Sequence, residues 1–416
     1  MMQTKEFEKT LGVALIHSET DPKQDLAPYA DLAPENVAFV ERFHKSIPFY
    51  RPTPLVSLEN LSKTLGVGGI YVKNESKRFE EFGLNAFKGM GGIFAVGQVI
   101  CRQLGLDPET TTYEMLNSPE IREKTKDMVF ITTTDGNHGR GVAWAANKLG
   151  QKAIVHMPKG SSKYRFDNIA KENAKVTIEE VNYDECVRIA AAEADSVEHG
   201  VIVQDTAWEG YTEIPSWIMQ GYATMGSEAL EQLKGYGVER PDVVILQAGV
   251  GCMAGAICAY IVNSYPDNPP KIVIAEAGIA DCLYQGAVAN DGKYRIVDGD
   301  LQTIMAGLAC GEPNIVCWEI LRNHVTAFCS CPDWMAAKGM RMLAAPVKGD
   351  PAVCSGESGA IGMGVIASLM TDPDYAELKE ALELNENSKV LLFSTEGYTD
   401  PDKYKSIVWG GEYATV

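Results

Sequence analysis

The chain has 416 residues, of which 45% are hydrophobic and 22% are charged, and this composition allows a sizeable core in one large domain or two smaller ones. Its formal net charge is -19. Because such a charge does not attract the phosphates of nucleic acids or anionic lipid headgroups, we expect neither nucleic acid nor membrane as a partner.

The first residues, "MMQTKEFEKTLG", mix charges with isolated apolar side chains and lack the apolar core of a targeting segment, so we expect a cytoplasmic protein. Most of the ten cysteines stand in apolar runs such as "GAICAY", where a thiol behaves as a small hydrophobe. The sequence leaves open whether Cys282 and Cys310 pair. We expect no bound metal, because the cysteines and histidines lack ligand spacing.

Short apolar strands alternate with helices along much of the chain. "DMVFITTT" precedes "HGRGVAWAANKLG", "KAIVHM" precedes "KYRFDNIAKENA", "VILQ" precedes "MAGAICAYIV", and "KIVIAEA" and "SKVLLFSTEG" follow. This alternation predicts an α/β fold with mostly parallel twisted sheets flanked by helices. The run 243–262 is long enough for a membrane span, but its glycines and Gln247 favour a strand, a loop and a helix.

In open α/β sheets, ligands bind in the loops at the carboxyl ends of the strands. The first such loop, "TTTDGNHGRG" at 132–141, offers Thr134, Asp135, Asn137 and His138 at a predicted helix start. Free amide groups there favour a carboxylate. The alternative interpretation is a plain Asx-type helix cap.

The second loop, "QAGVGCMAGA" at 247–256, matches the GxGxxA dinucleotide pattern through Gly249, Gly251 and Ala254. Glu276, at the end of the next strand, is placed where a ribose-binding acid is expected. A nicotinamide enzyme is therefore an alternative, although free amides at a helix start bind any phosphate equally well.

The third feature is "NAFKGMGG" at 85–92, in which Lys88 begins an apolar helix after Phe87. The small residues around it predict a lysine that points into a closed space, where burial lowers the pKa of the amine and makes it a usable nucleophile or base. The alternative is an ordinary solvated lysine. An amine, a phosphate loop and an asparagine loop together indicate a pyridoxal-phosphate (PLP) site.

Four motifs, "RPTPL", "NAFKGMGG", "TDGNHGRG" and "QAGVGCMAG", stand in the order and at the separations that resemble the tryptophan-synthase-β (fold type II) family of PLP enzymes. The resemblance covers the chain from about residue 35 onward. It implies a large PLP-binding domain at 1–88 and 210–416, a small domain at 89–209 that carries the asparagine loop, and a homodimer.

The resemblance also implies roles for individual residues. Lys88 would form the Schiff base with PLP, Asn137 would bond the ring oxygen, and Ser394 or Thr395 would face the pyridine nitrogen. The substrate carboxylate would lie against Thr134 and the amides of 135–138, up to His138. The cofactor phosphate would be held by the amides of Gly249, Val250, Gly251, Cys252 and Met253.

Within the family, "FGLNAFKGMGG", "QDTAWEGY" and "AGLACGEP" resemble the diaminopropionate ammonia-lyases. Asp135 stands where dehydratases carry a serine, and Asp205 follows another strand. Two acids suit a substrate with two amino groups. The resemblance therefore implies PLP-dependent α,β-elimination of 2,3-diaminopropionate, in one or both enantiomers, to pyruvate and two ammonia, with Lys88, Asp135 and Asp205 as catalytic residues.

Three alternatives stay open at this point. Another β-eliminating member of the family, such as a serine/threonine dehydratase, would act on serine in preference to the diamino acid. A nicotinamide-dependent oxidoreductase would use the second loop but would leave Lys88 without a role. A catalytically silent binding protein would hold PLP without turnover.

Overall fold

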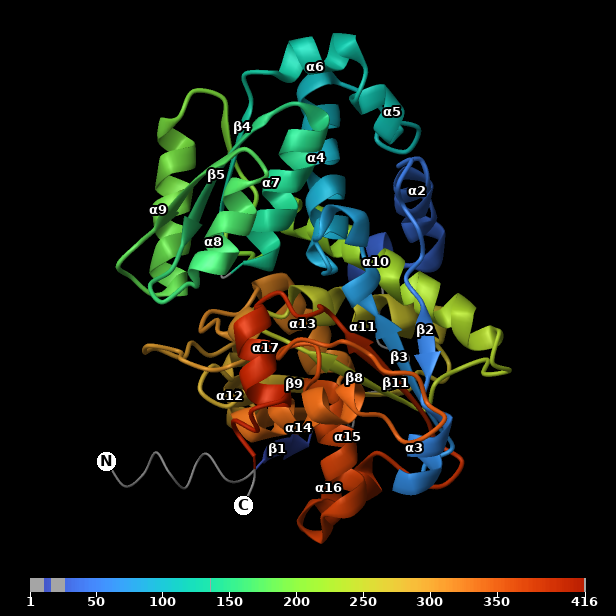
Figure 1. Cartoon of the computed structure of the whole chain (residues 1–416). Coiled ribbons are helices and arrows are strands. Elements are labelled where there is room, and N and C mark those ends of the chain that lie inside the picture. Colours follow the sequence, from blue (N-terminus) through green and yellow to red (C-terminus); the bar gives the residue numbers. More distant parts are fainter. Residues whose placement is uncertain (1–10, 16–26, 135, 415–416) are drawn as a thin grey trace.

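A computed structural model describes residues 11–15, 27–134 and 136–414, and it contains two separate sheets (Figure 1). The larger sheet has seven strands in the order β1-β10-β9-β8-β11-β3-β2. Its interior pairs are parallel, and the two edge strands, β1 and β2, are antiparallel to their neighbours. Its strands are β1 (Gly12–Leu15), β2 (Leu55–Ser57), β3 (Gly69–Asn74), β8 (Val243–Gln247), β9 (Lys271–Ala277), β10 (Ala327–Cys331) and β11 (Lys389–Ser394).

The smaller sheet is entirely parallel, in the order β6-β5-β4-β7. Its strands are β4 (Val129–Thr133), β5 (Lys152–Met157), β6 (Ala174–Ile178) and β7 (Gly200–Ile202). All four lie inside the segment 89–209 that we assigned to the small domain, and the strands of the larger sheet lie outside it. The α/β class and the mostly parallel sheets are thus confirmed, while the domain boundaries stay a prediction.

Helices cover both sheets, as Figure 1 shows. Around the smaller sheet lie α4 (Lys88–Leu104), α7 (Asn137–Leu149), α8 (Lys163–Ala170) and α9 (Tyr183–Ser196). The others are α2 (Pro34–Lys45), α3 (Glu59–Leu65), α5 (Tyr113–Leu116), α6 (Pro119–Thr125), α10 (Glu213–Lys234), α11 (Cys252–Ser264), α12 (Cys282–Ala289), α13 (Ile315–His324), α14 (Asp333–Ala344), α15 (Ile361–Thr371), α16 (Ala376–Ala381) and α17 (Pro401–Val408).

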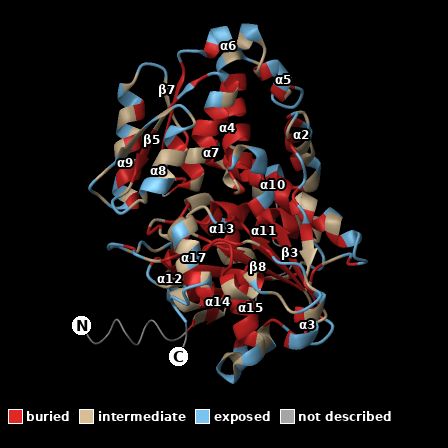
Figure 2. Ribbon diagram, in the orientation of Figure 1, coloured by how far each residue is buried: buried red, intermediate tan, exposed pale blue. Residues whose placement is uncertain are grey.

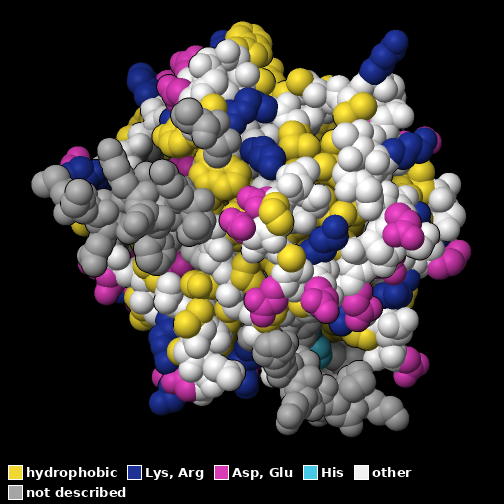
Figure 3. All heavy atoms as spheres, turned by 90° about the horizontal axis from the view of Figure 1, so that it is seen from below, with side chains coloured by type: hydrophobic (Ala, Val, Ile, Leu, Met, Phe, Trp, Pro, Cys, Tyr) yellow, Lys and Arg dark blue, Asp and Glu magenta, His cyan; other side chains and the backbone are white. Residues whose placement is uncertain are grey.

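The apolar run 243–262 forms strand β8, a short loop and helix α11, as predicted. Both elements are buried almost throughout (Figure 2), because the sheet and its covering helices enclose them from all sides. Within the described residues, no helix combines the length and the apolar character that crossing a membrane requires. On the face shown in Figure 3, basic side chains are scattered among acidic ones.

The glycines that follow Lys88 serve the packing of helices. A Cβ atom on Gly91 would lie 2.5 Å from the ring of Tyr222 on α10, and one on Gly92 would lie 3.0 Å from the backbone of Gly141 on α7. Helix α4 therefore approaches both α10 and α7 at backbone distance. The sequence predicts from these small residues a lysine that points into a closed space, and the structure shows what the glycines do: they bring together the helices that carry the site.

We expect Gly221→Ala to destabilise the protein by about 1–3 kcal/mol, the usual cost of overpacking a core. The new Cβ would lie 2.7 Å from Gly91 Cα and 2.9 Å from Met90 O, which are both backbone atoms. Gly362→Ala is the matched control on α15, because its Cβ would meet only side chains, at 3.4 Å and beyond. Urea denaturation of both variants tests this. Equal stability of the two variants would contradict the prediction.

The order of the larger sheet places the functional loops side by side. Strand β8 pairs with β9 on one side and with β11, the last strand of the chain, on the other. Strands β8, β9 and β10 follow one another toward one edge of the sheet, whereas β11 is parallel to β8 on its other side, so the strand order reverses between β8 and β11. Ligands in α/β sheets bind beside such a switch point. The loops 248–251 and 395–397 leave the sheet there.

Candidate active site

Lys88 is the first residue of α4, and the backbone before it is tied to the end of β11. Phe87 N donates to Thr395 O at 3.1 Å. The Lys88 ammonium lies 5.3 Å from the centre of the Phe87 ring and 5.8 Å from that of Tyr222, and it forms an ion pair with Asp205. Only 18% of the lysine side chain is exposed. The amine therefore lies in an enclosed, largely aromatic environment.

Asp205 follows β7 and is the counter-ion of this lysine. The carboxylate is buried, and His138 Nδ1 lies 3.7 Å from its Oδ2 atom. Burial raises the pKa of the Asp205 carboxyl, but the nearby positive charges of His138 and Lys88 outweigh burial and hold that pKa below its ordinary value. Asp205 is therefore an ionised, acceptor-only group at neutral pH.

Most of the predicted site residues line one inner pocket between the two sheets. The residues that the sequence singled out and that lie there are Lys88, Asn137, His138, Asp205, Gly249, Val250, Gly251, Cys252, Met253 and Thr395. Other residues also line this pocket, among them Phe87, Tyr183, Gln247 and Glu396. The three loops that the sequence identified thus converge on a single space.

Two predicted residues are turned away from this pocket, and one lies outside the described residues. The Thr134 hydroxyl is buried and accepts a hydrogen bond from Gly136 N at 2.8 Å, so it stabilises the loop from within. Ser394 Oγ bonds Ser355 Oγ at 2.8 Å behind the pocket wall. Asp135 lies outside the residues that the structure describes.

The hydroxyl of Thr395 faces the inner pocket, whereas that of Ser394 does not. Its Oγ1 atom accepts from Gln247 Nε2 at 2.9 Å, which leaves its own hydrogen available to donate. Gln247 Nε2 also donates to Phe393 O at 2.7 Å, so the glutamine amide is anchored to the end of β11. This geometry favours Thr395 over Ser394 as the donor to a ring nitrogen.

The loop after β8 forms an anion-binding helix start. Gly251 is the N-cap of α11 with φ of +96°, a conformation that favours glycine, and no side chain caps this end. The first amides of a helix have no carbonyl of their own helix to bond, and the helix dipole adds positive potential there. Cys252 and Met253 are the first residues of α11. Their amides and those of the loop are the donors that a phosphate requires.

Glu276 does not fit the nicotinamide interpretation. Its carboxylate is fully buried and accepts from Leu283 N at 2.9 Å and from Tyr284 N at 2.7 Å, at the start of α12. Both oxygens are therefore committed to capping a helix. Cys282, the first residue of α12, forms no disulfide bond with Cys310 in this structure, and its Sγ atom donates to Cys310 O at 3.9 Å.

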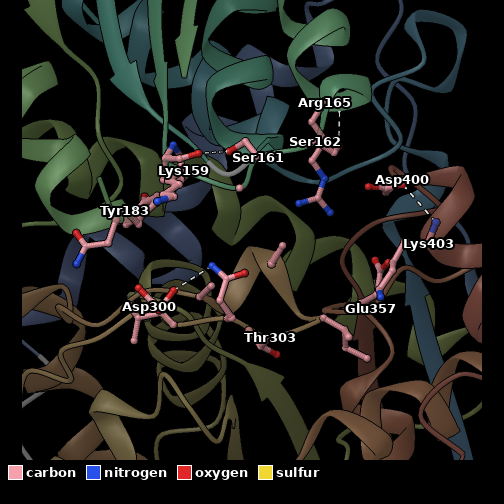
Figure 4. A pocket seen from close by; sticks show the side chains of 18 residues that line it. Lys159, Ser161, Ser162, Arg165, Tyr183, Asp300, Thr303, Glu357, Asp400 and Lys403 are labelled. Carbon is pink, nitrogen blue, oxygen red and sulfur yellow. Dashed lines mark hydrogen bonds between the residues drawn. The ribbon is translucent and has the colours of Figure 1, made fainter. Parts of the chain in front are cut away.

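A second, outer cleft shares Tyr183 with the inner pocket (Figure 4). The segment before and within α8 provides one wall, and the segment 300–306 together with the start of α17 provides the other. Glu357 lies in this cleft with its Oε1 atom lacking a hydrogen-bond partner among the described residues, and burial raises the pKa of its carboxyl. The charged side chains that Figure 4 labels along the cleft are Lys159, Arg165, Asp300, Glu357, Asp400 and Lys403.

The residues of the inner pocket fit PLP. Lys88 supplies an amine for the aldehyde, the uncapped start of α11 supplies amides for the phosphate, and Thr395 supplies a hydroxyl for the ring nitrogen. In addition, Gln247 Oε1 is buried without a hydrogen-bond partner within the described part of the chain, which is unusual for a packed core and typical of a ligand site.

Comparison with known proteins agrees with this fit. Residues 47–396 match the sequence profile of the family described as "Pyridoxal-phosphate dependent enzyme". The chain belongs to this family of PLP-dependent enzymes. The nicotinamide interpretation of the second loop is therefore wrong.

Within the family, the chain is similar to diaminopropionate ammonia-lyases. It is 52% identical over 373 residues to the enzyme of that name from Salmonella typhimurium, covering 89% of this chain and 91% of the relative. The holo crystal structure of the Escherichia coli enzyme superposes with a TM-score of 0.89 at 46% identity, covering 97% of this chain and 98% of that one. The same enzyme with an aminoacrylate-PLP azomethine reaction intermediate superposes at 0.86, with the same identity and coverage.

Sequence reasoning missed Gln247, Tyr183 and Glu396 as parts of the pocket. Gln247 was visible as a polar residue ending an apolar strand, and Glu396 as an acid directly after another strand. Tyr183 starts α9 after an ordinary Asn182 cap, whose side chain accepts from Glu185 N at 3.0 Å. No sequence signal separates that tyrosine from any other helix start.

Proposed function

We propose that this chain catalyses the PLP-dependent α,β-elimination of 2,3-diaminopropionate to pyruvate and two ammonia. The observation that carries the proposal is the pairing of Lys88 with the buried, ionised Asp205 in a pocket that also contains the phosphate-binding loop. Similarity to diaminopropionate ammonia-lyases over nine-tenths of the chain supports the choice of substrate. When bound, PLP would withdraw electrons from the substrate α-carbon and so weaken its C–H bond.

Lys88 has two tasks in this proposal. Its amine would hold the cofactor through the aldehyde, and in its free form the same amine would accept the α-proton of the substrate. The Phe87 and Tyr222 rings beside this amine limit the access of water to it.

Asp205 is suited to assist the departure of the β-amino group. An amine leaves a carbon atom readily only as ammonia from a protonated nitrogen, and an ionised carboxylate holds the β-nitrogen as ammonium. Serine offers no charge for this carboxylate to bind. The pocket therefore favours a diamino acid over serine, which weighs against the dehydratase alternative.

The substrate carboxylate would lie against the amides at the start of α7, beside Asn137 and His138. His138 Nε2 bonds Val203 O at 2.9 Å, and this contact fixes the ring so that Nδ1 faces Asp205. Asn137 would bond the ring oxygen and Thr395 the ring nitrogen. A neutral hydroxyl opposite that nitrogen leaves it unprotonated, which favours elimination over transamination.

We expect Asp135→Asn to reduce turnover of the D enantiomer by roughly 10²–10⁴-fold, the range for loss of a general base, and to spare the L enantiomer. The reason is a two-base hypothesis, in which Lys88 takes the α-proton of one enantiomer and Asp135 that of the other. Pyruvate formation from each enantiomer, measured separately, is the test. An equal loss on both would eliminate the two-base version while leaving the elimination itself intact.

The proposed function is tested directly with the purified protein and added PLP. We expect a visible absorption band from bound cofactor, pyruvate from D- or L-2,3-diaminopropionate, and much less pyruvate from serine. Activity on serine alone would select the dehydratase alternative. Bound cofactor with no turnover of either substrate would select a silent binding protein.

We further propose a homodimer in the cytoplasm, with PLP and an amino acid as the small-molecule partners. The dimer rests on the family resemblance, and the location rests on the expectation drawn from the sequence. Light scattering coupled to size-exclusion chromatography would test the dimer, and a single-chain mass would contradict it.

A further inference from the structure

Glu396 is a buried acid in the inner pocket to which the proposed chemistry assigns no role. It follows β11 by two residues, and only 5% of it is exposed. Its Oε2 atom accepts from Asn137 Nδ2 at 3.2 Å, and its Oε1 atom accepts from Gly359 N at 2.9 Å. The carboxylate thus joins the asparagine loop, which follows the smaller sheet, to a turn that belongs to the larger one.

The backbone of Glu396 is equally constrained. Its carbonyl accepts from Gly356 N at 2.9 Å, and it forms a β-bridge with Ala86, two residues before Lys88. Gly356 has room for this side chain only because it lacks a Cβ, which would lie 2.7 Å from Glu396 Cγ. The carboxylate is therefore held in place from three directions and cannot move away from Asn137 without disturbing the lysine segment.

We propose that Glu396 is a positioning residue that fixes the orientation of the Asn137 carboxamide for the cofactor. A carboxamide can present either its oxygen or its NH₂ group, and rotation interchanges them. Both carboxyl oxygens of Glu396 accept hydrogen bonds, one from Gly359 N and one from Asn137 Nδ2, so Glu396 binds the NH₂ end of the carboxamide rather than its oxygen. One Asn137 N–H then bonds Glu396, and the second is left to donate to the ring oxygen of PLP.

This inference rests on the proposed role of Asn137 toward that ring oxygen. Without Glu396, the carboxamide would present its oxygen to the cofactor oxygen for part of the time, and two acceptors repel each other. The expected consequence is weaker cofactor binding, with little change in the stability of the protein that lacks cofactor. A residue that only stabilised the 356–359 turn would, when replaced, lower the stability of the protein without cofactor and leave cofactor binding unchanged.

The test is a double-mutant cycle on PLP affinity, measured by titrating cofactor into apoprotein and following its absorbance. We expect Glu396→Gln to raise the PLP dissociation constant roughly tenfold, as for one lost hydrogen bond to a charged group. Glu59→Gln, an exposed glutamate on α3, is the matched control and should change nothing. In an Asn137→Ala background, Glu396→Gln should have no further effect.

Each outcome decides one point. If Glu396→Gln weakens PLP binding equally with and without Asn137, Glu396 does not act through the asparagine and the inference is wrong. If the variant instead lowers the melting temperature of the apoprotein while PLP affinity is unchanged, its role is structural and the inference is again wrong. If Asn137→Ala alone leaves PLP affinity unchanged, the underlying assignment of Asn137 fails, whatever Glu396 does.

Discussion

Lys88→Ala is expected to abolish the visible band of bound cofactor and to reduce pyruvate formation from diaminopropionate by at least roughly 10⁴-fold, the upper end for loss of a general base. The loss should be this large because one amine both holds the cofactor and accepts the α-proton. Its ammonium lies beside the packed rings of Phe87 and Tyr222 and bonds Asp205, and no other lysine of the described residues lines the inner pocket. Absorbance and a coupled pyruvate assay measure the two effects.

A chemical experiment on the unchanged protein checks the same assignment. Borohydride reduction of the holoenzyme should fix the cofactor irreversibly, and peptide mass spectrometry should find it on Lys88. Lys77→Ala is the matched control, because Lys77 is exposed and pairs with Glu80 on the surface. Label on another lysine, or substantial turnover by Lys88→Ala, would contradict the assignment.

Asp205→Asn is expected to reduce kcat/KM for diaminopropionate by roughly 10²–10⁴-fold, the range for a group that assists proton transfer to a leaving group. The amide keeps the shape of the side chain but cannot hold the leaving nitrogen as ammonium. The cofactor band should persist, because Asp205 is expected to contact neither the phosphate nor the ring. Its lowered pKa also predicts that the wild-type protein keeps this charge well into the acidic range.

The substrate β-chloroalanine separates this role from a general structural defect. Chloride leaves without a proton, so Asp205→Asn should affect its elimination far less than that of diaminopropionate. Asp184→Asn is a suitable control, since Asp184 lies on α9 outside the inner pocket and accepts from Gly311 N at 3.2 Å. Equal losses on both substrates would show that Asp205 does not act on the leaving group.

Several features of the site could be predicted because they are local in sequence. A strand followed by a glycine loop and a helix places free amides at the start of that helix, and this follows from hydrogen bonding within about fifteen residues. The sequence accordingly predicted the α/β class, the phosphate loop at 249–253 and the lysine at the start of α4. The family resemblance added the cofactor, which the comparisons confirm.

Other features depended on contacts between distant segments. Thr134 and Thr395 are both threonines at strand ends, yet the first bonds its own loop and the second faces the pocket beside Gln247. The choice between Ser394 and Thr395 depends on the direction of each side chain at the end of β11, and residues on a strand alternate between its two faces. No local pattern reveals which face of β11 borders the pocket.

The sequence by itself determined the fold class, the three loops and the amine, because strand and helix periodicity and free helix-start amides are properties of short segments. Only the tertiary structure decided that Asp205 neutralises Lys88, that Glu396 lies against Asn137, and that the glycines after Lys88 pack helices together. Lys88 and Asp205 are separated by more than 100 residues along the chain, as are Glu396 and Asn137. The glycines after Lys88 are equally far from α10, and only α7 lies nearer to them in sequence. Their proximity follows from the order of strands in the two sheets and from close helix packing, which depend on the burial of the whole core.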